Sequence, residues 1–219
     1  MKLIVWDFDG TLADTRPLIE AGMEHALAGL GLQDHPGIRE AWLRQVGLPV
    51  EEGLRRTFEG LEVDPADVLK VYRTFDWAAH ESLLRPFPGM SGLVRELRAL
   101  GARMAIASSK RTAPLTRQVA ALGWAGCFDP LVTPDDVRVG KPHPESLEIC
   151  LKAHGLPAGE AVMVGDTPFD LEMARRAGVP AVAVGHGFYG REALLECGPL
   201  AYAPDVPALR GILLPMVTP

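Results

Sequence analysis

Two carboxylates stand two residues apart in Asp7-Phe8-Asp9-Gly10-Thr11, directly after a short apolar run. The run predicts a buried strand, and a turn at Gly10 would direct both carboxylates toward one small volume at the strand's carboxyl end. Two like charges held this close cost free energy unless a cation or a shared proton relieves them. Because oxygen ligands favour Mg2+, the segment predicts a magnesium site, with an Asx turn in an ordinary loop as the alternative.

A second polar motif, Ser108-Ser109-Lys110, follows an apolar run that ends at Ala107. A hydroxyl together with adjacent backbone N–H groups at a strand end can hold a phosphoryl oxygen. Serines at such positions also cap the helix that follows, so this motif alone leaves both interpretations open.

Lys141 stands in the proline-rich segment Gly140-Lys141-Pro142-His143-Pro144. The two prolines stiffen the loop and fix the direction of the lysine, which suits a cation that neutralises both a carboxylate and a transferring phosphoryl group. A solvated lysine ahead of a helix is the alternative.

Two more carboxylates, Asp166 and Asp170, follow another strand-like run. Asp166 would complete a metal site with Asp7, whereas Asp170 lies one helical turn further on and could orient ligands or waters. A helix start with acidic first-turn residues is the alternative. The four motifs support one another because each lies on a separate loop that the same sheet edge would gather.

Short strands alternating with helices are expected to position these motifs. Helical patterns that end at Gly101 and Gly178 precede two of the strands. The strands are predicted from runs that are apolar on both faces, at residues 2–6, 103–107, 161–164 and 181–184. The alternation predicts an α/β fold with a Rossmann-like, doubly wound parallel-sheet core, covered by helices on both sides.

Residues 15–85 consist of amphipathic segments and contain no convincing strand. Helical segments are expected at 17–30, 38–46, 50–58 and 64–84. Two prolines and a glycine in residues 85–89 suit a stiff return of the chain to the core. We therefore expect an α-helical cap domain at 15–85, inserted into a catalytic core made of residues 1–14 and 86–219.

The chain has 219 residues, a formal net charge of −6 and a pI near 5.5. This balance leaves no basic stripe for nucleic acid and no polybasic patch for a membrane, so phosphate binding must be local. Cys127, Cys150 and Cys197 form no CxxC pair and are expected to be reduced. Without a signal-peptide core or an apolar run of ~20 residues, we expect a cytoplasmic protein, either a monomer or a homodimer.

These motifs, in this order, resemble those of the haloacid dehalogenase-like phosphohydrolase superfamily. The resemblance implies a phosphatase that passes through an aspartyl-phosphate intermediate on Asp7, with Asp9 as general acid and base. It implies that Ser108 and Lys141 hold the phosphoryl oxygens. The insertion at 15–85 matches the position of the superfamily's first type of helical cap.

The resemblance also implies a Mg2+ site. Asp7, Asp166 and the backbone carbonyl of Asp9 would be its ligands, and Asp170 would support them. Substrate contacts are expected from Thr11, Ser109 and Lys110, and the substrate would be a small phosphorylated metabolite.

Four positions bear on the activity within the superfamily. Asp9 argues against the dehalogenases, which lack a carboxylate there. Lys70 is the only lysine between residues 14 and 86 and stands late in the insertion, which argues against the phosphonate-cleaving members with a Schiff-base lysine. Ile19 and Val50 stand where β-phosphoglucomutases carry a histidine and an arginine, and this favours a phosphatase over a mutase.

The segments 47–58 and 86–89 look most like the phosphoglycolate phosphatase-like branch. 2-Phosphoglycolate is therefore the leading candidate substrate, with pyrophosphate and other small phosphomonoesters close behind. A phosphomutase and a non-catalytic binding module are the alternatives. Four arginines of the insertion could meet a substrate carboxylate or could be solvated charges on helix faces: Arg16, Arg44, Arg55 and Arg56.

Overall fold

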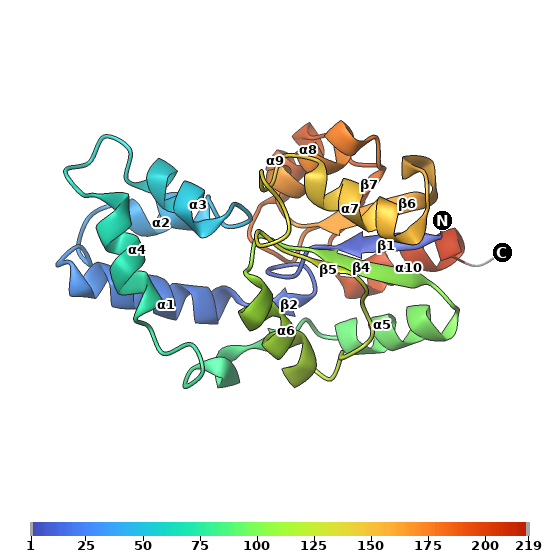
Figure 1. Ribbon diagram of the computed structural model, residues 1–219, viewed down its shortest axis with the longest axis horizontal. Coiled ribbons are helices and arrows are strands. Elements are labelled where there is room, and N and C mark those ends of the chain that lie inside the picture. The colour runs from blue at the N-terminus through green and yellow to red at the C-terminus, as the bar shows by residue number, and fades with distance from the viewer. Residues whose placement is uncertain (1, 218–219) are drawn as a thin grey trace.

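The computed structural model describes residues 2–217 and contains a six-stranded sheet with the strand order β5-β4-β1-β6-β7-β8 (Figure 1). All neighbouring strands of this sheet run parallel. The strands are β1 (Leu3–Trp6), β4 (Arg103–Ala107), β5 (Leu131–Val132), β6 (Ala161–Gly165), β7 (Ala181–Val184) and β8 (Ala201–Ala203). The predicted α/β, Rossmann-like fold class is confirmed.

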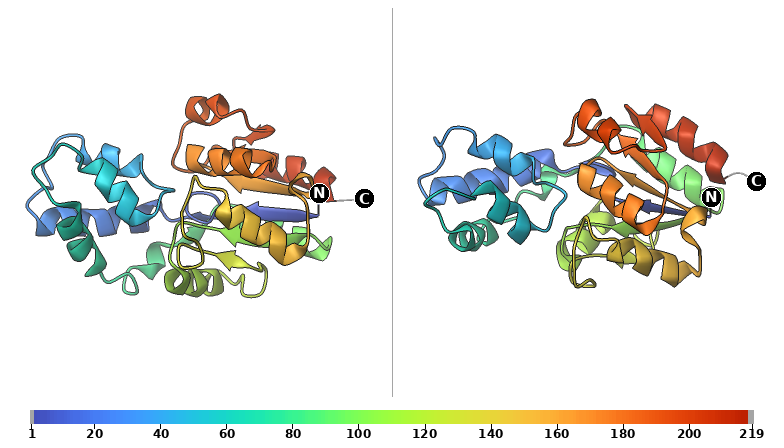
Figure 2. Two further views of the ribbon diagram at one scale, coloured as in Figure 1. Left: turned by 45° about the horizontal axis from the view of Figure 1, so that its top comes forward. Right: turned by 90° about the horizontal axis from the view of Figure 1, so that it is seen from above.

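Helices cover both faces of this sheet (Figures 1 and 2). Because side chains alternate across a strand, Ile4 and Trp6 of β1 pack against one layer of helices while Leu3 and Val5 pack against the other. One layer is α5 (Met90–Ala99), α6 (Thr112–Ala121) and α10 (Val206–Val217). The other is α7 (Glu145–His154), α8 (Pro168–Ala177) and α9 (Arg191–Glu196). Burial on both faces explains why the central strands are continuously apolar.

Residues 15–85, called the insertion below, leave and re-enter the core through two paired strands. These strands, β2 (Ala13–Asp14) and β3 (Arg85–Pro86), form an antiparallel ribbon that the sequence did not predict. The insertion contains α1 (Arg16–Gly29), α2 (Ile38–Leu43), α3 (Val50–Thr57), α4 (Pro65–Arg73) and the 3-10 helix η1 (Glu81–Leu83). Figures 1 and 2 show these helices beyond the carboxyl ends of the strands.

The insertion has a hydrophobic cluster of its own, formed by residues such as Leu27, Trp42 and Phe58. A separate cluster supports the prediction that residues 15–85 form a cap domain, and this division of the chain stays a proposal. The helices α2 and α3 lie within the predicted segments 38–46 and 50–58, and α1 begins one residue before the predicted 17–30. The predicted segment 64–84 is divided between α4 and the 3-10 helix η1.

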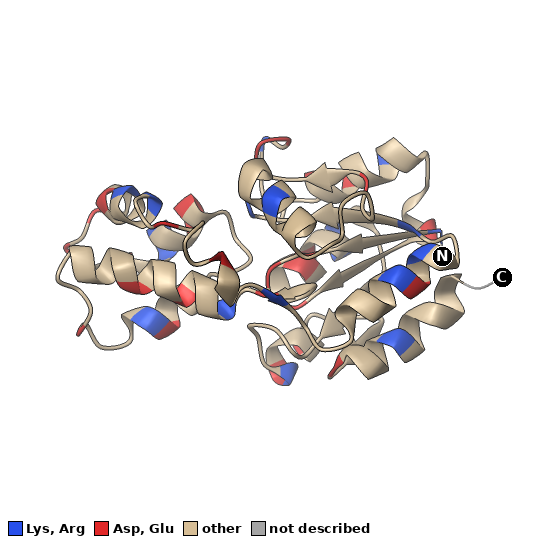
Figure 3. Cartoon of the chain, turned by 90° about the horizontal axis from the view of Figure 1, so that it is seen from below, with Lys and Arg blue, Asp and Glu red and all other residues tan. Residues whose placement is uncertain are grey.

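Acidic and basic residues are interspersed on the helices of both the core and the insertion in the view of Figure 3. Several form ion pairs, such as Glu96 with Arg210 at 2.6 Å. Within residues 2–217, none of the helices combines the length and apolar character that crossing a membrane requires.

Candidate active site

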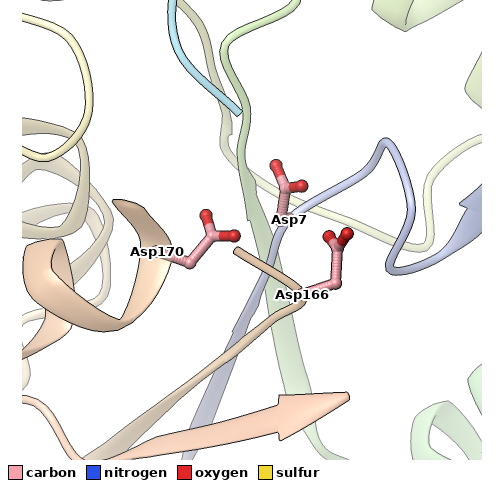
Figure 4. A group of neighbouring side chains, drawn as sticks. All are labelled: Asp7, Asp166 and Asp170. Atoms are coloured by element: carbon pink, nitrogen blue, oxygen red, sulfur yellow. The ribbon is translucent and has the colours of Figure 1, made fainter. Parts of the chain in front are cut away.

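The carboxyl ends of β1 and β6 and the start of α8 bring three carboxylates together. Asp7, Asp166 and Asp170 lie side by side in Figure 4, and each has a carboxylate oxygen within 4.8 Å of the others. All three side chains are buried. This arrangement matches the predicted gathering of separate loops at one sheet edge.

Lys141 is the cation of this cluster. Its Nζ donates hydrogen bonds to Asp7 Oδ1 and to Asp170 Oδ1, both at 2.6 Å, and the residue is buried. Burial alone would lower the pKa of Lys141, but the negative charges of Asp170 and Asp7 outweigh it and raise the pKa, so the ammonium keeps its charge.

Negative charge nevertheless exceeds positive charge in this cluster. Burial raises the pKa of Asp7 to about 7, although Lys141 opposes the shift. Burial and the charges of Asp7 and Asp170 also raise the pKa of Asp166 well above its usual range. Three buried carboxylates around one ammonium form a donor set that fits a divalent cation with oxygen ligands.

Asp166 is held from two sides. The Thr11 hydroxyl donates to Asp166 Oδ1 at 2.8 Å, and the Phe188 backbone N–H donates to Oδ2 at 2.7 Å. Both Gly10 and Gly187 lie against this carboxylate, because a Cβ at either position would clash with Asp166 Oδ2. Thr11 therefore orients a carboxylate, and its predicted contact with substrate stays a prediction.

Asp170 is fixed by the start of its own helix. Thr167 caps α8, and its hydroxyl donates to Asp170 Oδ2 at 2.7 Å while the Asp170 N–H donates back to the Thr167 hydroxyl at 3.2 Å. One carboxylate oxygen thus faces the helix cap and the other faces Lys141. Asp170 can therefore orient Lys141, as its predicted supporting role requires.

The side chain of Asp9 pairs with a different cation. Lys110 Nζ lies 2.6 Å from Asp9 Oδ1 and donates to Gln118 Oε1 at 2.9 Å. Sequence reasoning did not identify Gln118, because a glutamine on the face of α6 carries no pattern that separates it from a surface residue. Asp9 and Lys110 therefore form an ion pair that is separate from the cluster of Asp7, Asp166 and Asp170.

The two serines of the motif after β4 have different partners. Ser108 is buried, and its Oγ accepts the Lys110 N–H at 3.2 Å. Ser109 Oγ instead donates to the carbonyl of Gly47 in the insertion, at 2.6 Å. Ser109 therefore links the core to the insertion in this structure, and its role in binding substrate stays a prediction.

A cavity of about 560 Å³ lies between these strand ends and the insertion. Asp7, Asp9, Ser108 and Lys110 line its core side, and residues of α1, α3 and α4 line the opposite side. Asp7 and Ser108 therefore both line the same cavity.

The family model described as haloacid dehalogenase-like hydrolase matches residues 4–184, which include all of the strand-end motifs. This chain belongs to that family. The predicted family and the predicted class of enzyme, a phosphatase of the haloacid dehalogenase-like hydrolases, are confirmed.

Sequence similarity to named phosphatases extends over most of this hydrolase. The pyrophosphatase PpaX of Bacillus velezensis is 32% identical over 207 residues, which are 92% of this chain and 89% of that protein. The phosphoglycolate phosphatase of Rhodospirillum rubrum is 29% identical over 95% of this chain and 89% of that protein.

Solved structures share the fold of this hydrolase over nearly its whole length. A hydrolase from Pseudomonas syringae superposes with a TM-score of 0.85 at 24% identity, covering 97% of this chain and 98% of that chain. A crystal structure described as a predicted phosphatase from Clostridium acetobutylicum gives a TM-score of 0.86 at 21% identity, covering 98% of both chains. At these identities the likeness concerns the fold, including the helical insertion.

Proposed function

We propose that this hydrolase is a Mg2+-dependent phosphatase that transfers the phosphoryl group of a small phosphomonoester to Asp7 and then to water. The observation that carries the proposal is the pairing of Asp7, which lines the cavity, with the buried ammonium of Lys141. A nucleophile for a phosphate dianion needs positive charge beside it, and Lys141 supplies that charge without access to bulk water.

The donor set supports a Mg2+ ion held by Asp7, Asp166 and the backbone carbonyl of Asp9. When bound, the ion would neutralise charge on the transferring phosphoryl group. Asp170 would keep Lys141 and the metal ligands in place through its contacts with Lys141 and Thr167. The raised pKa values of Asp7 and Asp166 fit a site that lacks one positive charge.

In the first step an Asp7 carboxylate oxygen attacks phosphorus, an acyl phosphate bond forms and the ester P–O bond breaks. Asp9 gives its proton to the departing alcohol oxygen. In the second step Asp9 takes a proton from water, the water oxygen attacks phosphorus, and inorganic phosphate leaves as Asp7 is restored. Asp9 lines the cavity, where a leaving-group oxygen and later a water molecule can reach it.

The names of the relatives supply two candidate substrates. The similarity to phosphoglycolate phosphatase supports 2-phosphoglycolate, and the similarity to PpaX supports pyrophosphate. The apolar residues Ile19 and Val50 line the cavity at the positions where β-phosphoglucomutases carry a histidine and an arginine. The absence of these two side chains disfavours a mutase. A non-catalytic module is disfavoured because the nucleophile, the acid–base residue and Lys141 are all present.

Phosphate release from 2-phosphoglycolate, pyrophosphate, β-glucose 1-phosphate and p-nitrophenyl phosphate, with and without Mg2+, tests the proposal. We expect release that requires Mg2+ and falls at least about 10³-fold in Asp7→Asn, since a covalent nucleophile cannot be replaced by an amide. Conversion of β-glucose 1-phosphate to glucose 6-phosphate without free phosphate would identify a mutase. Full activity of Asp7→Asn would refute the role of Asp7.

A further inference from the structure

The insertion faces the cavity with an apolar wall, which we define as Leu18, Ile19, Val50, Leu69, Tyr72 and Trp77. The rings of Tyr72 and Trp77 pack edge to face, with centroids 5.0 Å apart. Burial raises the pKa of Tyr72, so its phenol stays neutral. Opposite the carboxylates, the cavity therefore presents hydrocarbon and aromatic surface.

The cations that reach the cavity already have anionic partners. Within the described residues, three lysine or arginine side chains line it. Their pairs are Lys110 with Asp9 at 2.6 Å, Arg73 with Glu51 at 2.7 Å, and Arg111 with Asp135 at 2.7 Å. A second anionic group on a substrate would have to displace one of these carboxylates before it gained a counter-charge.

The other arginines of the insertion do not line the cavity. Arg55 and Arg56 both bond to Glu52, at 2.8 Å and 2.7 Å. Arg16 lies over the ring of Phe188, 4.6 Å from its centroid. The sequence-based idea that these arginines meet a substrate carboxylate therefore finds no support in this arrangement.

Size also argues for a leaving group with a hydrocarbon body. Cavities between about 300 and 1,000 Å³ typically hold whole small molecules, and this one measures about 560 Å³. A phosphoryl group at Asp7 leaves most of that space facing the apolar wall. Contact with this wall removes apolar surface from water, whereas a second carboxylate or phosphate there would lose its hydration.

We infer that the preferred substrate is the phosphate monoester of an uncharged alcohol with an apolar, preferably aromatic, body that packs on this wall. This inference rests on the proposed phosphatase function and names its class of leaving group. It ranks such esters ahead of 2-phosphoglycolate and pyrophosphate, since both carry a second anionic group.

The first test compares substrates whose leaving groups differ mainly in the body that would meet the wall. With Mg2+ present, we expect kcat/KM for 2-phenylethyl phosphate to exceed that for ethyl phosphate and 2-phosphoglycolate by about 10- to 100-fold, as expected for burial of one aromatic side group. Equal values for the phenylethyl and ethyl esters, or a preference for 2-phosphoglycolate or pyrophosphate, would overturn the inference. Those results would leave the phosphatase intact, whereas the absence of Mg2+-dependent hydrolysis of every compound would refute the proposed function itself.

The second test places one charge on the wall. Val50→Lys should shift the ratio of kcat/KM for 2-phosphoglycolate over 2-phenylethyl phosphate by at least about tenfold toward 2-phosphoglycolate, because it adds an unpaired cation beside the cavity. Val50→Met has a side chain of similar length without the charge and should not favour 2-phosphoglycolate. Ala28→Lys adds the same charge to an exposed site on α1 and should leave the ratio unchanged. A ratio that is the same in Val50→Lys and Val50→Met would contradict the role of the wall.

Discussion

Asp7 illustrates how burial governs chemistry at the level of a single residue. Its carboxylate lies beside Lys141, yet burial still raises its pKa to about 7. The folded, metal-free chain thus binds this proton more tightly than the unfolded chain, whose carboxyl titrates near the ordinary 3.8. Stability without metal should therefore be greatest below about pH 4 as far as Asp7 alone is concerned, and should fall as the pH rises toward about 7.

Metal binding should show the opposite trend. A divalent cation binds the ionised carboxylates and displaces their protons, so its affinity falls as the pH falls. We expect about 10 mM MgCl2 to raise the Tm of the protein more at about pH 8 than at about pH 6, as measured by differential scanning fluorimetry. A matched addition of NaCl at equal ionic strength controls for screening. An equal rise in Tm at both pH values would contradict proton release from this cluster.

Lys110 offers a second prediction at the level of one residue. Its ammonium bonds to the proposed acid and base, Asp9, and to the buried Gln118. Lys110→Met keeps the length of the side chain but removes the charge and these bonds, so we expect kcat to fall about 10²-fold. Lys152→Met, an exposed lysine on α7, is the control and should retain normal steady-state kinetics. A normal kcat in Lys110→Met would show that Lys110 does not act on Asp9.

The same residues show how far a sequence can define a site. Asp7 and Asp166 were predictable because each follows an apolar run, and parallel strands gather their carboxyl ends at one edge. Lys141 was predictable because it stands in a loop that two prolines stiffen. The contributions of Gln118 and Phe188 were not, since one lies on a helix face and the other acts through its backbone N–H. A backbone donor leaves no signature in the type of its residue.

At the level of elements, the central strands were predictable and the edges were not. β1, β4, β6 and β7 are buried on both faces and read as continuous apolar runs. β5 and the ribbon strands β2 and β3 contain two residues each, and pairing with a neighbour rather than propensity makes them strands. Such elements depend on tertiary contacts that a local pattern does not contain.

The loop between α2 and α3 allows an element-scale prediction. Gly47 has a φ of +107°, and a Cβ there would lie 2.9 Å from the side chain of Thr167, which caps α8 and bonds to Asp170. We expect Gly47→Ala to destabilise the fold by about 1–3 kcal/mol in urea unfolding, and to lower activity by disturbing Asp170.

A second glycine of the insertion provides the control for this substitution. Gly31 also has a positive φ, but a Cβ there would meet nothing within 4 Å. Gly31→Ala therefore carries the backbone strain without the contact to the core and should keep normal kcat. If Gly31→Ala and Gly47→Ala lost the same activity, the contact with Thr167 would have no role.

At the scale of the whole molecule, the cavity depends on how the insertion meets the core. Several contacts join them in addition to the ribbon. Ser109 bonds to Gly47, Arg16 lies over Phe188, and the Tyr189 hydroxyl donates to the carbonyl of Arg44. Arg117 of the core also pairs with Glu81 of the insertion at 2.9 Å. No motif predicted these contacts, because each joins residues far apart in the sequence. They place the apolar wall opposite the carboxylates.

Tyr189→Phe should loosen this junction while leaving the core sheet unchanged. Removing one hydrogen bond of about 1 kcal/mol shifts a local opening equilibrium about fivefold, so we expect amide hydrogens in residues 44–48 to exchange about fivefold faster. Hydrogen–deuterium exchange by mass spectrometry measures this rate, with Tyr202→Phe in β8 as the control in the core.

If the contact between Tyr189 and Arg44 also positions the apolar wall, KM for the preferred ester should rise more than kcat falls, because the wall binds the leaving group rather than the reacting phosphorus. Exchange that is unchanged at 44–48 would contradict a role of the Tyr189 hydroxyl in holding the insertion on the core.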